Sequence, residues 1–124
     1  MAHLVDSSVL VALFLDFDTQ HAKAQRLWES LHGDILLPYC IATETATVLC
    51  YKHSKEQANQ FLTFLDDTRD VTVIDGDIRA EMDFYRHSVA RISFADAVLL
   101  FLARTRAAQL VTFDDQLERL WRAG

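Results

Sequence analysis

Short apolar runs alternate along the chain with longer stretches of helical periodicity. The apolar runs end at polar residues typical of turns and helix starts, which predicts short buried β-strands. Between them, apolar positions recur every three or four residues, which predicts helices. The predicted strands are His3–Val5, Ile35–Leu37, Val71–Ile74 and Gln109–Thr112, and the predicted helices cover about residues 19–32, 39–52, 55–67, 77–88, 94–106 and 115–122, with a further helical run directly after Asp6.

Strands that alternate with helices favour a parallel sheet between two layers of helices. The chain has 124 residues and is 51% hydrophobic, which is enough for one buried core, and we expect a single domain over residues 1–124. One proline and three glycines are too few for a loop-rich or disordered chain.

Charge and composition limit the classes of function. The formal net charge of −6 argues against broad, sequence-independent attraction to nucleic acid, so a nucleic-acid substrate would need positive charge from another source. The longest apolar run, Val9–Leu15, is too short to cross a bilayer and follows no basic segment, so we expect neither a membrane span nor a signal peptide, and a cytoplasmic location. Cys40 and Cys50 have no ligand spacing, so neither a zinc site nor a disulfide framework is expected.

Acidic residues stand where a site is expected. Ligands of open α/β sheets bind beyond the carboxyl ends of the strands. Asp6 and Asp114 follow directly on predicted strands, and Glu44 lies in the second turn of a helix that begins after the second strand. Asp96 opens the helix near Phe94, whose start periodicity alone does not place at this edge.

Each acid also has a plain structural interpretation. Asp6 and Asp114 are typical N-cap residues. Glu44 shares a helix face with Ile41 and Val48, and could pair with Lys52 or lie at the edge of the apolar stripe. The segment from Ser93 to Asp96 fits an S-x-x-D capping box.

Together, four carboxylates at one sheet edge would repel one another, and a hard divalent cation such as Mg²⁺ would relieve that repulsion. The cation would also supply the missing positive field and support phosphodiester hydrolysis by an activated water. Ser7 and Thr112 are candidates to hydrogen-bond the carboxylates, whereas Ser8 is more simply a capping hydroxyl. Four basic residues could line a groove for a phosphate backbone or lie on solvated helix faces: Lys52, Lys55, Arg86 and Arg91.

Four motifs in this order resemble the PIN-domain family, specifically the VapC-type toxins. They are Val5-Asp-Ser-Ser-Val-Leu10, Ile41-Ala-Thr-Glu44, Ser93-Phe-Ala-Asp-Ala97 and Leu110-Val-Thr-Phe-Asp114. Each motif is short, but all four together, in the family's order and spacing, span nearly the whole chain.

The resemblance implies a PIN-like three-layer α/β/α fold around a central parallel sheet of four to five strands. It also implies that Asp6, Glu44, Asp96 and Asp114 bind Mg²⁺ or Mn²⁺, that the chain cleaves RNA endonucleolytically, and that it forms a homodimer inhibited by a cognate antitoxin. Asp114 fits the last motif, and its neighbour Asp115 either contributes or caps. Replacing Asp6 or Asp96 with Ala is expected to abolish cleavage and leave the fold intact or more stable, because each change removes one charge from a repelling cluster.

Three alternatives belong to other classes. The segment Val11–Thr19 resembles the D-x-D-x-T motif of haloacid-dehalogenase-like phosphatases, with Asp16 as nucleophile and Asp18 as acid/base. A second is a non-catalytic, Mg-binding receiver-like module, although that would require paired acids after the first strand and a Lys after the last. A third is a catalytically silent domain that only binds an antitoxin-like partner.

Overall fold

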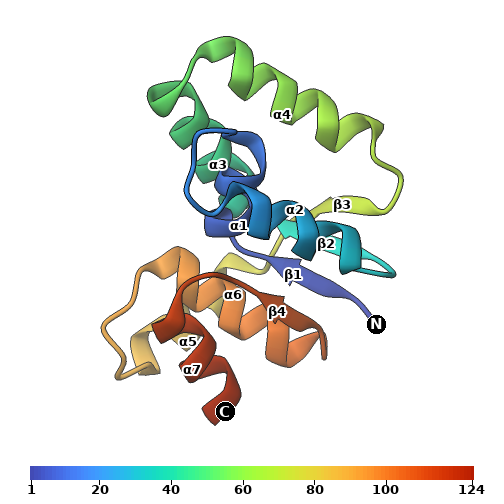
Figure 1. Ribbon diagram of the computed structural model, residues 1–124. Coiled ribbons are helices and arrows are strands. Elements are labelled where there is room, and N and C mark those ends of the chain that lie inside the picture. The colour runs from blue at the N-terminus through green and yellow to red at the C-terminus, as the bar shows by residue number, and fades with distance from the viewer.

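The computed structural model describes all 124 residues (Figure 1). Four strands alternate with seven helices, and each element lies within a few residues of its predicted position. In chain order they are β1 (His3–Val5), α1 (Ser7–Phe14), α2 (His21–Ser30), β2 (Ile35–Pro38), α3 (Tyr39–Lys52), α4 (Lys55–Asp67), β3 (Val71–Ile74), α5 (Ile78–His87), α6 (Phe94–Thr105), β4 (Gln109–Val111) and α7 (Asp115–Ala123).

The sheet is parallel throughout, with the strand order β3-β2-β1-β4. Helices α1 to α4 lie on one side of it and α5 to α7 on the other, which confirms the predicted three-layer arrangement (Figure 1). The sheet has four strands, the lower end of the predicted range.

One hydrophobic cluster of 25 buried residues fills the space between the layers. All three residues of β1 are buried, as expected for a central strand covered on both faces. Helix α6 contributes more buried residues than any other helix, namely six: Ala97, Val98, Leu99, Leu100, Leu102 and Ala103.

The strand order creates a switch point between β1 and β4. From β1 the chain proceeds to β2 and β3 on one side, and it returns to place β4 on the other side. The connections that leave β1 and β4 therefore run to opposite faces and leave a crevice at the carboxyl ends of these strands. Asp6 follows β1 and Asp114 lies just beyond β4, so both border the crevice.

Two boundaries differ from their predictions for local reasons. The predicted helix 19–32 is shorter, because Asp18 accepts a hydrogen bond from the Gln20 backbone N–H at 2.8 Å in a turn before His21. The predicted strand to Thr112 ends at Val111, and the Thr112 hydroxyl bonds to Asp6 instead. No helix combines the length and the apolar character needed to cross a membrane.

Candidate functional site

A pocket of about 450 Å³ opens at the switch point, and all four predicted acids line it. We call it the acidic pocket. Its lining comes from the ends of β1 and β4, from α1 and the turn that follows it, from α3, and from the start of α6. The lining residues are Asp6, Ser7, Ser8, Val11, Asp18, Gln20, Glu44, Val48, Lys52, Ser93, Asp96, Phe113 and Asp114.

Asp6 is the fixed point of this pocket. Its side chain is only 5% exposed and caps α1 by accepting a hydrogen bond from the Ser7 backbone N–H at 2.7 Å. The other carboxylate oxygen, Oδ2, accepts from the Ser8 hydroxyl at 2.9 Å and from the Thr112 hydroxyl at 2.7 Å. A buried carboxylate is tolerated when several donors satisfy it, so these bonds replace the lost hydration of Asp6.

The same two hydroxyls tie Asp6 to the segment after β4. The Ser8 hydroxyl accepts a hydrogen bond from the Phe113 backbone N–H at 3.1 Å, and the Thr112 hydroxyl accepts one from the Asp114 backbone N–H at 2.9 Å. Asp114, in turn, caps α7 by accepting from the Leu117 backbone N–H at 3.1 Å. The backbone positions of the two strand-end acids are therefore coupled.

The hydrogen bonds correct one sequence-based expectation. Ser8, interpreted as a simple capping hydroxyl, holds the Asp6 carboxylate more closely than does the Ser7 hydroxyl, whose distance to Oδ1 is 3.4 Å. Thr112 makes the contact with a carboxylate that the sequence suggested. Asp115 is the first residue of α7 and lies outside the lining of the acidic pocket.

Glu44 reaches the acidic pocket from α3, but it is not buried as its place in an apolar stripe suggested. The buried face of α3 is formed by Ile41, Ala42, Thr45 and Leu49, and Glu44 is exposed at the edge of that face. Lys52 is the only basic residue that lines the pocket, and it forms no salt bridge with Glu44. The Glu44 carboxylate is therefore free to bind a cation.

Asp96 enters from the first turn of α6, which periodicity alone did not place at this edge. Its backbone N–H donates to the Ser93 hydroxyl at 3.1 Å, so Ser93 caps the helix, while the reciprocal bond of a capping box is absent. Burial, together with the nearby carboxylates of Asp6, Asp114 and Glu44, raises the pKa of the Asp96 carboxyl to about 6, although a hydrogen bond from the Ser93 hydroxyl acts in the opposite direction. The other three carboxylates are thus close enough to Asp96 to affect its ionisation.

Sequence reasoning did not foresee Asp18 and Ser93 as lining residues of the acidic pocket. Asp18 arrives there because the turn after α1 folds back toward the sheet edge. Asp16, the proposed nucleophile of the phosphatase alternative, follows a helix rather than a strand, is exposed and lies outside the pocket. The arrangement therefore lacks the strand-end nucleophile that the phosphatase chemistry needs.

The donor set suits a hard cation, because it consists of carboxylate oxygens without Cys or His. In the side-chain positions of the structure, no three His, Cys, Asp or Glu side chains come close enough together to hold a metal ion. The hydrogen bonds fix Asp6, whereas no hydrogen bond holds the Glu44 carboxylate and only the Ser93 hydroxyl bonds to that of Asp96.

Asp96→Asn is expected to stabilise the metal-free protein at pH 7.5 by about 1 to 2 kcal/mol, a range reduced for solvent screening of a half-buried group. The pKa of Asp96 in the folded state, about 6, lies above its ordinary value of 3.8. The ionised carboxylate therefore destabilises the fold increasingly as pH rises from about 3.8 to about 6, and the penalty is complete above pH 6 and absent below about 3.8. Urea unfolding from pH 3 to 8 measures the difference. Asp83→Asn should change the stability by less than about 0.5 kcal/mol, because its ion pair with His87 is exposed. A stabilisation by Asp96→Asn that does not vary with pH would contradict the account.

Asp6 differs from Asp96, because its removal leaves satisfied donors without an acceptor. We therefore expect Asp6→Ala to lower the stability of the fold, which corrects the prediction made from the sequence. For Asp96→Ala we still expect a fold that is intact or more stable.

Thr112→Val is expected to lower the free energy of unfolding by about 1 to 3 kcal/mol, since it removes a donor to buried Asp6 and an acceptor for the Asp114 N–H. Thr105→Val is the matched control. That hydroxyl bonds to the Phe101 carbonyl at 2.9 Å on the exposed side of α6, and its loss should cost under about 0.5 kcal/mol. Chemical denaturation measures both variants, and equal losses would show that the Asp6 network has no special role.

The fold matches three solved structures. Mycobacterium tuberculosis VapC20, described as a sarcin–ricin loop cleaving toxin, superimposes with a TM-score of 0.85 at 25% identity, over 95% of this chain and 94% of that chain. PAE2754 from Pyrobaculum aerophilum matches with a TM-score of 0.61 at 17% identity, over 94% and 82% of the two chains. VapBC2 from Rickettsia felis matches with 0.61 at 16% identity, over 96% and 92%. A search of curated protein sequences found no significant match.

The sequence comparison agrees with the structural one. The family model described as the PIN domain matches residues 3–122, which include all four acids. Together with the VapC20 structure, this match confirms the resemblance to VapC-type toxins and supports the predicted ribonuclease over the phosphatase and receiver-like alternatives. The chain therefore belongs to the PIN-domain family.

Proposed function

We propose that this chain is a divalent-metal-dependent endoribonuclease, the toxin of a toxin–antitoxin pair, with Asp6, Glu44, Asp96 and Asp114 as its metal-binding and catalytic residues. The observation that carries the proposal is the acidic pocket itself. Four carboxylates face one crevice at the switch point, with Lys52 as the only basic residue among the lining. The negative charge of this crevice attracts a divalent cation, whereas it repels the phosphates of an RNA backbone.

Within the acidic pocket the acids have different tasks. Asp6 would provide a fixed oxygen ligand, because the Ser8 and Thr112 hydroxyls hold its carboxylate. Glu44 and Asp96 would supply further oxygen ligands, and Asp114 would offer the carboxylate oxygen that does not cap α7. A bound cation would relieve the repulsion that adds to burial in raising the Asp96 pKa. A bound Mg²⁺ or Mn²⁺ lowers the pKa of a coordinated water and neutralises charge on the scissile phosphate. The chain therefore needs no side-chain nucleophile for phosphodiester hydrolysis.

The partners follow from the family resemblance and from the surface. We propose that the chain acts in the cytoplasm as a homodimer and that a cognate antitoxin inhibits it. The Rickettsia felis VapBC2 structure, bound to DNA from the promoter, is a related assembly and supports the antitoxin. Large apolar side chains lie exposed on α3, α4 and β3, where a protein partner would cover them: Tyr51, Leu62 and Val73.

Cleavage of RNA by the purified protein tests the proposal. A sarcin–ricin loop RNA is the first substrate to try, because it is the stated target of VapC20. We expect cleavage with Mn²⁺ or Mg²⁺ that stops in EDTA, and a loss of about 100-fold or more in Asp96→Asn. Asp16→Asn serves as the control, because Asp16 is exposed and lies outside the acidic pocket.

The controls separate the alternatives. Undiminished cleavage by Asp96→Asn would remove Asp96 from the site, and loss of activity in Asp16→Asn would restore the phosphatase interpretation. A well-folded wild type that cleaves neither this RNA nor total ribosomal RNA with either metal would support the catalytically silent domain instead.

A further inference from the structure

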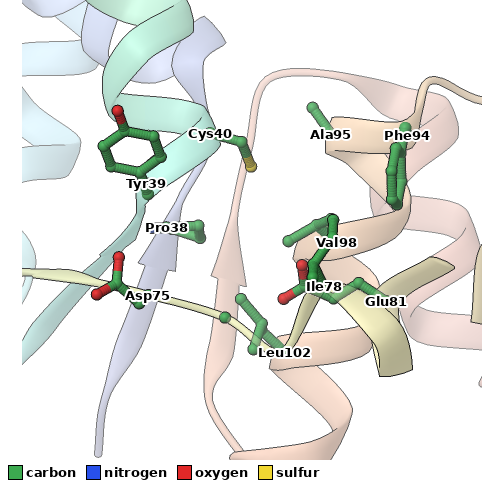
Figure 2. A pocket seen from close by; sticks show the side chains of 11 residues that line it. Pro38, Tyr39, Cys40, Asp75, Ile78, Glu81, Phe94, Ala95, Val98 and Leu102 are labelled. Carbon is green, nitrogen blue, oxygen red and sulfur yellow. The ribbon is translucent and has the colours of Figure 1, made fainter.

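A second hollow, of about 450 Å³, lies beside the acidic pocket. It opens between the starts of α3 and α6 and is closed by α5 and the loop that precedes it (Figure 2). We call it the α3–α6 hollow. Most of its lining is apolar, from Pro38, Cys40, Ile78, Phe94, Val98 and Leu102.

A buried carboxylate interrupts this apolar lining. Glu81 is only 6% exposed, forms no salt bridge, and its Oε2 atom is fully buried without a hydrogen-bond partner. The carboxylate lies against Gly76, where a Cβ atom would come within 1.8 Å of Oε2, so the glycine leaves it room. Burial raises the pKa of Glu81, and the nearby carboxylate of Asp77 adds to the rise.

A fully buried carboxylate oxygen without a hydrogen-bond donor destabilises the empty hollow. A backbone hydrogen bond from Asp77 offsets part of the desolvation of Glu81, but the desolvation of Oε2 remains uncompensated until a donor reaches it. A suitable ligand therefore presents adjacent N–H groups to Glu81 and apolar surface to Val98, Leu102 and Ile78.

Aromatic side chains at the rim indicate a flat ligand. Tyr39 is 62% exposed and Phe94 is 36% exposed, and both line the hollow. Phe94 stacks on Tyr85, with ring centroids 5.1 Å apart and an interplanar angle of 18°, which holds its ring in place. Exposed aromatic rings are the usual platform on which proteins stack unpaired bases of RNA.

The hollow and the acidic pocket share two helices. Cys40 lies one turn before Glu44 on α3, and Ala95 directly precedes Asp96 on α6. The carboxylates of both Glu81 and Glu44 raise the pKa of the half-buried Cys40 thiol in addition to its burial, so Cys40 is within electrostatic range of the two sites. A base in the hollow would therefore belong to a nucleotide adjacent to the acidic pocket.

We propose that the α3–α6 hollow binds an unpaired guanine base of the RNA substrate, with the Glu81 carboxylate accepting the N1–H and N2–H groups. This inference rests on the proposed ribonuclease function and gives it a base preference. Guanine presents two adjacent donors on one edge of a flat ring, which matches both oxygens of a carboxylate. Because Oε2 is buried against Gly76, the Glu81 side chain would have to rotate into the hollow to present both oxygens to the base. Uracil is a poor fit, because carbonyl oxygens flank its single N–H and would face Glu81.

An arginine side chain of a protein partner offers a similar pair of N–H donors. The size of the hollow and its aromatic rim favour the ring over the narrower side chain. The two ligands can be compared directly with small probes.

Nucleoside titration tests the proposal without cleavage or metal. Guanosine, inosine and uridine are added to the metal-free full chain, and methyl NMR signals of Ile78, Val98 and Leu102 are followed. Guanosine should shift these signals, inosine should bind more weakly because it lacks the N2 amino group, and uridine should not bind. Glu81→Gln should weaken guanosine binding about tenfold or more, because Gln offers one acceptor and an opposing donor. Asp83→Asn, on the exposed side of the same helix, should bind as the wild type does.

Three results would overturn the proposal: no shift with guanosine, equal binding of uridine, or unchanged guanosine affinity in folded Glu81→Gln. Binding of N-acetylarginine amide where guanosine fails would also overturn it, in favour of a protein partner. Circular dichroism checks each variant for folding. If Glu81→Gln does not fold, Ala95→Leu, which narrows the hollow and retains the carboxylate, should block guanosine. The titration measures binding and needs no cleavage. If guanosine does not bind, the ribonuclease proposal is unaffected. If the protein does not cleave RNA, a measured affinity for guanosine is still valid.

Discussion

The geometry of the acidic pocket depends on a buried carboxylate at the end of the central strand. Asp6 is surrounded by the donors of its own helix start and by the hydroxyl of Thr112, which lies 106 residues later in the chain. Burying this charge is tolerable only because these donors replace water. The same hydrogen bonds align the end of β1 with the segment after β4, so that satisfying one charge fixes the crevice at the switch point.

A fixed Asp6 has a consequence for the acids around it. They enter from three different elements and cannot avoid its field by moving their backbones, because α3 and α6 are anchored in the core. The pKa of Asp96 therefore rises, through its burial and through the charges beside it. The fold thus gives up some stability to hold these charges close together, as expected where a functional ligand compensates the repulsion. Glu81 shows a similar conflict in an apolar setting, because its Oε2 atom is buried beside Gly76 without a hydrogen-bond donor.

Local sequence patterns predicted the elements of this fold well. The strands are short apolar runs that end at polar residues, and α3, α4 and β3 begin and end where periodicity indicated. Asp6 and Asp114 could be placed at the site because they follow parallel strands, whose carboxyl ends share one edge. Glu44 was placed there as well, but its pattern could not decide between burial and exposure at the edge of the apolar stripe, since a stripe on a helix does not show where its edge meets solvent.

Other features of the site depend on long-range packing. The start of α6 reaches the acidic pocket only through the path of β3 and α5 around the sheet, so Asp96 could not be positioned from its own helix. Ser8 contacts Asp6 because α1 begins at once after the strand, and Phe113 then completes the hydrogen bonds of its hydroxyl. Glu81 has no sequence signal of burial, because the glycine that accommodates it lies in the preceding loop.

The central claim is that the four carboxylates form one divalent-cation site, and calorimetric titration of Mn²⁺ tests it most directly. The account predicts saturable binding to the wild type and affinity at least about tenfold weaker in Asp96→Asn, which loses one ligand charge. A folded wild-type protein that binds no Mn²⁺, or an Asp96→Asn variant that binds it equally well, would contradict the claim and reduce the acids to helix caps and surface charges.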